Sequence, residues 1–121
     1  MAAPNLINTS SIYGKTTGAS LGTFNQAYLT CPANKVLKVN TIVVSNIDGT
    51  NAADVTVRFY DSSQPSTLTL ASTINVPADS TLVVLSKDTS IYLEESDRID
   101  AFASATGDLD IIISYEEIDD A

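Results

Sequence analysis

The sequence predicts an all-β protein, and three observations lead to that prediction. Thr, Val, Ile and Tyr, which suit half-buried, pleated strands, are abundant, and Ser and Thr together number 28 of the 121 residues. Short segments of alternating apolar and polar residues recur about every 8–12 residues, with turn residues between them. No window of a dozen residues carries apolar positions at helical spacing. Together these features favour an antiparallel β-sandwich of about eight strands.

The first 22 residues differ from the rest of the chain, because they are rich in Gly, Ser, Thr and Asn. They form either an edge strand around Asn5–Tyr13 followed by a long loop, or an extended arm that becomes ordered only against a neighbour. We therefore divide the chain into an N-terminal arm or edge strand (1–22) and a β-sandwich domain (23–121). The large apolar side chains of the arm are candidate interface residues: Leu6, Ile7, Ile12 and Tyr13.

The next segments are predicted strands, beginning with Phe24–Leu29. The long strand Lys35–Ile47 alternates at first, but its stretch 42–44 is apolar on both faces. Either a bulge shifts the register there, or one end of the strand is covered on both sides. After a turn at Asp48–Asn51, the strand Asp54–Tyr60 alternates cleanly and directs Val55, Val57 and Phe59 inward. Its outward side carries Arg58 and Tyr60, which we also expect at an interface.

Short apolar segments continue to the end of the sequence, separated by polar turns. One turn is the acidic corner Glu94–Asp97, and another is Thr106–Asp108. The remaining predicted strands are Thr67–Val76, Leu82–Leu85, Ile91–Leu93, Ile99–Ala103 and Leu109–Tyr115.

The composition argues against an enzyme. The chain has no His, so it lacks the usual general base and the His-dependent nucleophile arrangements. Its single cysteine, Cys31, cannot form an internal disulfide and is expected to be a small buried apolar residue. The loop Asp48–Asp54 offers three oxygen donors, but its spacing matches no EF-hand. We expect no cofactor and no metal.

The net charge of −9, from fifteen acidic and six basic residues, argues against binding to nucleic acid. Apolar runs are too short to span a membrane, and the first residues lack the pattern of a secretory signal. We therefore expect synthesis in a cytoplasm, with no membrane partner. An acidic surface of this kind keeps copies apart in solution, or meets a basic partner.

Two segments resemble a group of small virion proteins of tailed bacteriophages, many of them from marine and cyanobacterial hosts. They are KVLKVNTIVVSNIDGTNAADVTV (35–57) and INVPADSTLVVLSKDTSIYLEESDRIDAFASATGDLDIIISYEE (74–117). Ser96 departs from the pattern of this group, which usually has Gly at that place in the acidic corner. The resemblance implies a small β-sandwich, of jelly-roll or Ig-like type, that sits on a virus particle.

From these features we expect a non-enzymatic virion structural protein, made in the host cytoplasm and located on the particle. The leading hypothesis is a capsid decoration (cement) protein that contacts the major capsid protein or other virion proteins. It is expected to be a homo-oligomer, and a trimer suits local three-fold positions. One alternative is an accessory or adaptor protein of the neck, tail or baseplate. The other is a carbohydrate- or receptor-binding module.

Overall fold

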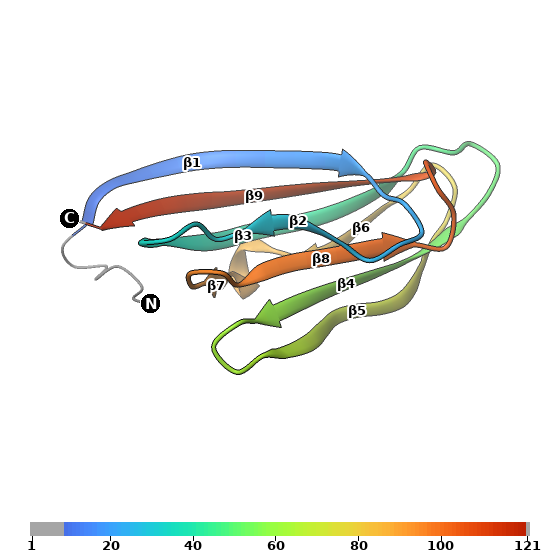
Figure 1. The fold of residues 1–121 in the computed structure, drawn as a ribbon. Helices are drawn as coiled ribbons and strands as arrows, with labels where there is room; N and C mark the ends of the chain where they lie inside the picture. The colour runs from blue at the N-terminus through green and yellow to red at the C-terminus, as the bar shows by residue number, and fades with distance from the viewer. Residues whose placement is uncertain (1–8, 121) are drawn as a thin grey trace.

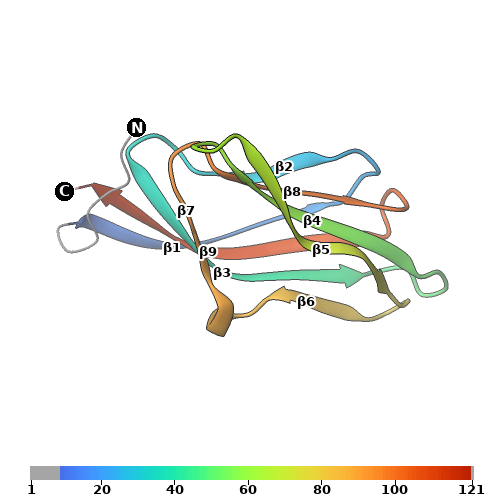
Figure 2. The ribbon, with the colours of Figure 1, turned by 90° about the horizontal axis from the view of Figure 1, so that it is seen from below.

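The chain folds into two antiparallel β-sheets packed face to face, which confirms the predicted all-β sandwich (Figures 1 and 2). The structure is a computed structural model and describes residues 9–120. The first sheet has the order β1-β9-β3-β6, with β7 also pairing with β3, and the second has the order β2-β8-β4-β5. The elements are β1 (Thr9–Ser20), β2 (Gln26–Thr30), β3 (Lys35–Asn46), β4 (Ala53–Asp61), β5 (Ser66–Val76), β6 (Thr81–Leu85), the 3-10 turn η1 (Lys87–Thr89), β7 (Ile91–Leu93), β8 (Arg98–Ala103) and β9 (Leu109–Asp120).

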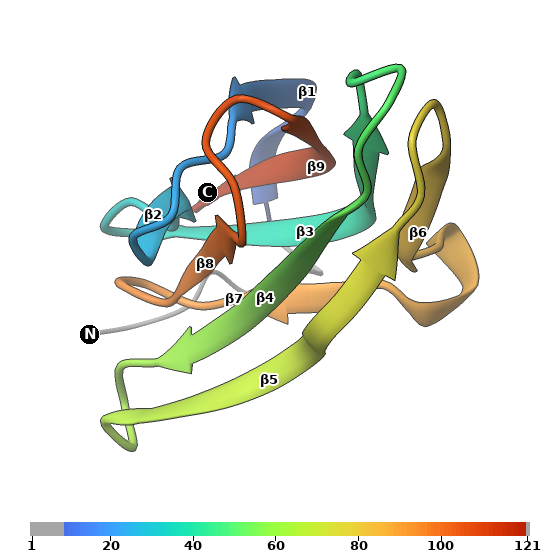
Figure 3. The same cartoon turned by 90° about the vertical axis from the view of Figure 1, so that its right-hand side faces the viewer.

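The strand pairs are nested within one another along the chain. The hairpin β4–β5 is innermost, β3 pairs with β6 and β7, β2 pairs with β8, and β1 pairs with β9. The molecule is thus one long hairpin rolled over itself, which is the strand order of a jelly roll. Figure 3 shows the β4–β5 hairpin crossing in front of the first sheet.

The core lies between the two sheets, and β3 shows how the sequence builds it. Leu37, Val39, Ile42 and Val44 are all buried, although strict alternation would place the first two and the last two on opposite faces. The pairing of β3 with β9 shifts register between Val39 and Thr41. Of the two alternatives offered by the apolar stretch, the structure shows the bulge, just before that stretch, and the bulge keeps the strand's apolar side chains on one face.

The structure corrects three boundaries. The long loop expected after Tyr13 is instead strand, because β1 pairs with β9 as far as Ser20 and gains a partner for its backbone there. The strand expected from Phe24 begins at Gln26, and Phe24 is exposed. The final strand continues past Tyr115, since its last residues pair with both β1 and β3. The sequence did not predict the full length of β1 because its residues are mostly small and polar. They form a strand because they pair with β9, not because of their own strand propensity.

A buried carboxylate organises the acidic corner before β8. Asp97 is almost fully buried, and its Oδ2 accepts a hydrogen bond from the backbone N–H of Glu94 at 3.0 Å. Its Oδ1 accepts one from the backbone N–H of Ser62, in the loop between β4 and β5, at 2.9 Å. Ser96 has a left-handed backbone with φ of 72°. The Gly of the resembling group would adopt this conformation without strain, whereas Ser96 adopts it at a cost.

Candidate interaction surfaces

The outer face of the second sheet carries two arginines stacked on two aromatic rings, from neighbouring strands β4 and β8. The guanidinium of Arg98 lies 4.0 Å from the ring centroid of Tyr60, and that of Arg58 lies 5.1 Å from the centroid of Phe102. We call Arg58, Tyr60, Arg98 and Phe102 the Arg–aromatic face. The register explains one of these contacts directly, because Tyr60 stands opposite Arg98 across the two strands.

A buried carboxylate holds this face in place. Asp100, which is 2% exposed, accepts hydrogen bonds from the Nε of Arg98 at 2.9 and 3.2 Å. It also accepts one at 3.3 Å from the Nδ2 of Asn25. Arg58 forms no ion pair within residues 9–120, so its charge is free to meet a carboxylate from outside. Preorganised arginines and aromatic rings are the residues that dominate binding energy at protein interfaces.

The other sequence-predicted interface residues lie at the opposite side of the molecule or outside the described part. Ile12 and Tyr13 belong to β1 and are 57% and 52% exposed. Leu6 and Ile7 lie outside the described residues. The structure therefore does not bring the candidate residues together in one surface, since Arg58 and Tyr60 belong to the second sheet and Ile12 and Tyr13 to the first.

Strand β5 carries a third apolar surface, which the sequence did not predict. On β5, Leu68 and Ile74 pair with the inward-facing Phe59 and Val55, yet they remain 61% and 40% exposed. They lie at the margin of the core, where the opposing sheet ends in the short strands β6 and β7. We call Leu68, Leu70 and Ile74 the β5 margin. No pattern of charge pointed to this surface, because residues 62–78 carry no charge but neither do residues 16–34.

The outer face of the first sheet has an apolar row of its own. Ile112 of β9 stands between Gly18 of β1 and Val43 of β3, and Val43 stands opposite Val83 of β6. Ile112 and Val83 are exposed, and Val43 is half-buried. Gly18 suits this row, because a Cβ there would lie 3.1 Å from the carbonyl oxygen of Ile111, which is a tight contact.

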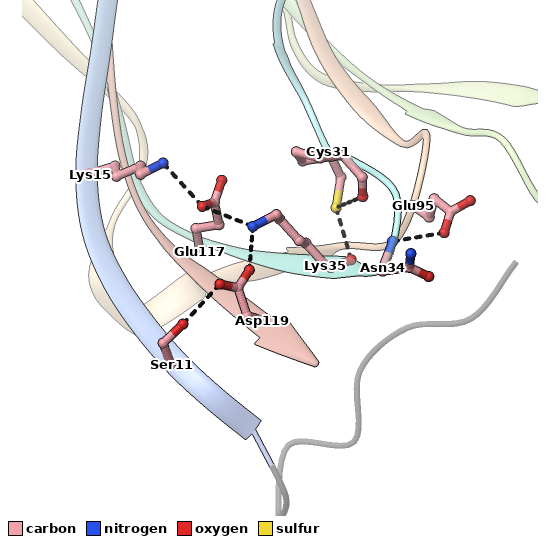
Figure 4. Close-up of polar contacts among 9 residues, drawn as sticks. Ser11, Lys15, Cys31, Asn34, Lys35, Glu95, Glu117 and Asp119 are labelled. Atoms are coloured by element: carbon pink, nitrogen blue, oxygen red, sulfur yellow. Dashed lines mark hydrogen bonds and ion pairs between the residues drawn. The ribbon is translucent and has the colours of Figure 1, made fainter. Parts of the chain in front are cut away.

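Ion pairs fasten β1 to the rest of the first sheet at the end where β9 finishes (Figure 4). The Nζ of Lys15 donates to Oε2 of Glu117 at 3.0 Å, and the Nζ of Lys35 lies 3.5 Å from the same oxygen. Lys35 also pairs with Asp119, to which the Oγ of Ser11 donates a hydrogen bond at 2.8 Å. The hydrogen bond from Lys35 holds the pKa of Asp119 below its usual range, and Asp119 in turn raises the pKa of Lys35.

Cys31 lies close to this cluster but takes no part in it (Figure 4). It is 2% exposed, and its Sγ–H points at the carbonyl oxygen of Lys35, 3.2 Å away. Burial raises the pKa of its thiol to about 11. The prediction that Cys31 is a buried apolar residue is confirmed.

Within residues 9–120, no group of three or more acidic, His or Cys side chains is arranged to hold a metal ion, and no pocket is present. None of the described segments is a helix long and apolar enough to cross a membrane.

Comparisons with known proteins identify the fold but no family. No family model matches the chain. No characterised protein matches it in sequence. One similar solved structure comes from Bacillus endospore appendages, which form a novel family of disulfide-linked pili. It shares 11% sequence identity with this chain, covers 92% of it and 88% of its own length, and has a TM-score of 0.55. At this identity the likeness concerns the β-sandwich fold alone.

Proposed function

We propose that this protein is a non-enzymatic structural subunit of a tailed-phage particle, and specifically a decoration protein on the outside of the head. The observation that carries the proposal is the Arg–aromatic face, a partly exposed surface in which Arg58 pairs with no acidic side chain of residues 9–120. The resemblance of residues 35–57 and 74–117 to small phage virion proteins supports the same reading.

The Arg–aromatic face suits a partner that presents carboxylates beside apolar groups, as the outer surface of a capsid subunit can. Tyr60 and Phe102 supply apolar area, and Arg58 has a guanidinium not engaged by any acidic side chain of the described residues. The stacking of Arg98 on Tyr60 reduces the side-chain entropy lost on binding. The β5 margin lies on the inner side of the same sheet, because Leu68 and Ile74 pair with the inward-facing Phe59 and Val55, and it is therefore a separate surface.

The mechanism is non-covalent. A typical stable protein interface buries about 1,600 Å² in total. A decoration subunit that spans two capsid subunits adds such an interface to each seam. Because packed DNA strains the shell from inside, the added contact offsets part of that strain and delays rupture of the head.

The test uses heads that lack the protein, to which purified subunit is added back. Wild-type protein should bind to saturation at hundreds of copies per head and raise the temperature at which DNA is released. The double variant Arg58→Ala/Phe102→Ala should lose most of this binding while remaining folded. Lys87→Ala, which removes a positive charge from the exposed η1 turn, is the matched control and should bind like wild type.

Cryo-EM of the complete particle separates this proposal from its main alternative, an adaptor of the neck, tail or baseplate. Density over the whole head supports decoration, whereas density confined to the portal vertex or tail supports the adaptor. Absence from the particle would reject both and leave a soluble carbohydrate- or receptor-binding module.

A further inference from the structure

The outer edge of β1 is the longest regular strand edge that the described residues leave unpaired. From Ser11 to Ser20, β1 pairs with β9 without any shift of register, and β1 is the terminal strand of its sheet (Figures 1 and 3). In an antiparallel pair, half of a strand's backbone N–H and C=O groups point away from its partner. Along β1 these groups form a straight row that is ready to accept another strand.

The other long edge, β5, is protected in a way that β1 is not. The pairing of β5 with β4 shifts register twice, and Thr73 has a positive φ of 50° at one of these irregularities. Bulges of this kind block the approach of a further strand. Between Ser11 and Ser20, β1 has no bulge and no proline, and its one charged residue, Lys15, is already paired with Glu117.

Two identical copies can approach each other at this edge because it carries few of the negative charges that repel them elsewhere. With a net charge of −9, two copies repel each other over most of their surfaces. No acidic residue precedes Asp48, so β1, β2 and β3 carry none. Of the acids on the neighbouring strand β9, Glu117 and Asp119 are paired with lysines, and Glu116 accepts a hydrogen bond from Asn40.

Gly14 supplies an independent indication of a close neighbour. Glycine weakens a strand, and here neither crowding nor backbone conformation requires it. Apart from its two sequence neighbours, no residue between 9 and 120 has an atom within 4 Å of a Cβ placed at Gly14, and the φ of Gly14 is not positive. The flanking side chains of Ile12 and Tyr13 are more than half exposed. Close approach of another backbone is one of the roles of a glycine inside a strand, and it is the role that agrees with the open edge of β1.

We propose that β1 pairs antiparallel with β1 of a second copy, about a two-fold axis at Thr16, which places Thr16 opposite Thr16 and Lys15 opposite Thr17 of the second copy. The two first sheets then join into one continuous sheet, and Ile12 and Tyr13 of each copy become covered. Such an interface is self-complementary and closes at the dimer, unlike the head-to-tail contacts of a trimer. The inference concerns the subunit itself and holds whether or not the protein decorates a phage head.

Sedimentation velocity over a range of concentrations tests the proposal. Wild-type protein should change from a monomer of 12.8 kDa to a species of twice that mass. Thr16→Glu places like charges opposite each other near the axis and should weaken the association at least about tenfold. Thr69→Glu is the matched control, since it adds the same charge to an exposed threonine on the other free edge, and it should leave association unchanged.

Each other outcome overturns the proposal. A wild-type chain that stays monomeric at all concentrations excludes the dimer, and a threefold mass excludes closure about a two-fold axis. If Thr69→Glu dissociates the dimer and Thr16→Glu does not, the interface lies at β5 and not at β1. Amide hydrogen exchange of the wild-type chain gives a readout that does not depend on a variant's folding. Protection of residues 11–20 must rise with concentration, while protection of 66–76 must not.

Discussion

The guanidinium of Arg98 lies over the ring of Tyr60, which stands directly opposite it on the neighbouring strand, and its Nε donates hydrogen bonds to the buried carboxylate of Asp100. One side chain thus links a half-buried aromatic ring to a buried acid. Arg58 stacks on Phe102 without such an anchor. The two arginines of the Arg–aromatic face therefore differ in how firmly they are held, and this difference can be measured.

Arg98→Ala should lower the free energy of unfolding by about 1–3 kcal/mol, because Asp100 would remain buried with only Asn25 as a partner. Arg58→Ala should cost about 0.5–1 kcal/mol, the value of a partly exposed cation–π contact. Urea unfolding of both variants checks the prediction. Equal losses in the two variants would mean that the anchor contributes nothing.

Ser96→Gly should stabilise the protein by about 0.5–1 kcal/mol. The left-handed backbone at Ser96 costs roughly 1–2 kcal/mol for a residue with a Cβ, and glycine's greater freedom in the unfolded chain cancels part of the gain. Ser90→Gly is the control, because Ser90 has an ordinary φ of −54° and no strain to relieve. That variant should be destabilised. If both variants change stability in the same direction, the strain at Ser96 is not what limits this turn.

The ion pair between Lys35 and Asp119 should make stability depend on pH at both extremes. Since folding lowers the pKa of Asp119, its contribution is complete above the usual carboxyl pKa of about 3.9 and is lost as pH falls through the lower folded value. Since folding raises the pKa of Lys35, its contribution is complete below about 10.4 and is lost as pH rises through the higher folded value.

Calorimetry between pH 2 and 7 measures the acid side of this dependence. Asp119→Asn should lower Tm at pH 7, and the gap to wild type should close towards pH 2. In a Lys35→Met background, most of the gap should be absent at every pH, because the main partner of Asp119 is gone. A Tm difference between wild type and Asp119→Asn that stays constant from pH 7 to pH 2 would contradict the lowered pKa of Asp119.

Cys31 should be almost inert towards thiol reagents while the protein is folded. With a pKa of about 11, only roughly one thiol in a thousand is ionised at pH 8, and burial also blocks access. Reaction with a disulfide reagent should be at least about a hundredfold slower in native buffer than in 6 M guanidinium. Thr50→Cys places a thiol in the exposed β3–β4 loop and should react at once in either condition. Rapid labelling of native wild-type protein would show that the β2–β3 turn opens.

Much of this fold was predictable because its signals are local. Alternation along β4, the turns between strands and the bulge in β3 all depend on neighbours in the sequence. The order of β1 was not predictable in this way, because its small and polar residues become strand only through pairing with β9. Strand propensity describes how a residue fits a surface, and here a distant segment provides the surface.

The candidate surfaces also depend on contacts between distant segments, which the local sequence does not predict. Arg58 and Tyr60 are neighbours on one face of β4, and the sequence suggested that they act as a pair. In the structure each instead contacts a residue of β8, 44 positions further along the chain for Arg58 and 38 for Tyr60. The register between β4 and β8 sets these partners, and nothing near Tyr60 in the sequence indicates Arg98. The exposure of the β5 margin likewise depends on where the opposing sheet ends.

The position of β9 between β1 and β3 affects how the protein folds during its synthesis. Ser11 and Asp119, which bond to each other across this sheet, are separated by 108 positions. While the chain is being synthesised, β1 and β3 emerge from the ribosome long before the strand that joins them. Until residues 109–120 are made, β1 and β3 lack the strand that pairs with both of them, and their apolar face is not yet covered. Such topologies fold slowly and are prone to mispair. We therefore expect nascent chains to depend on protection by chaperones until this last strand has emerged.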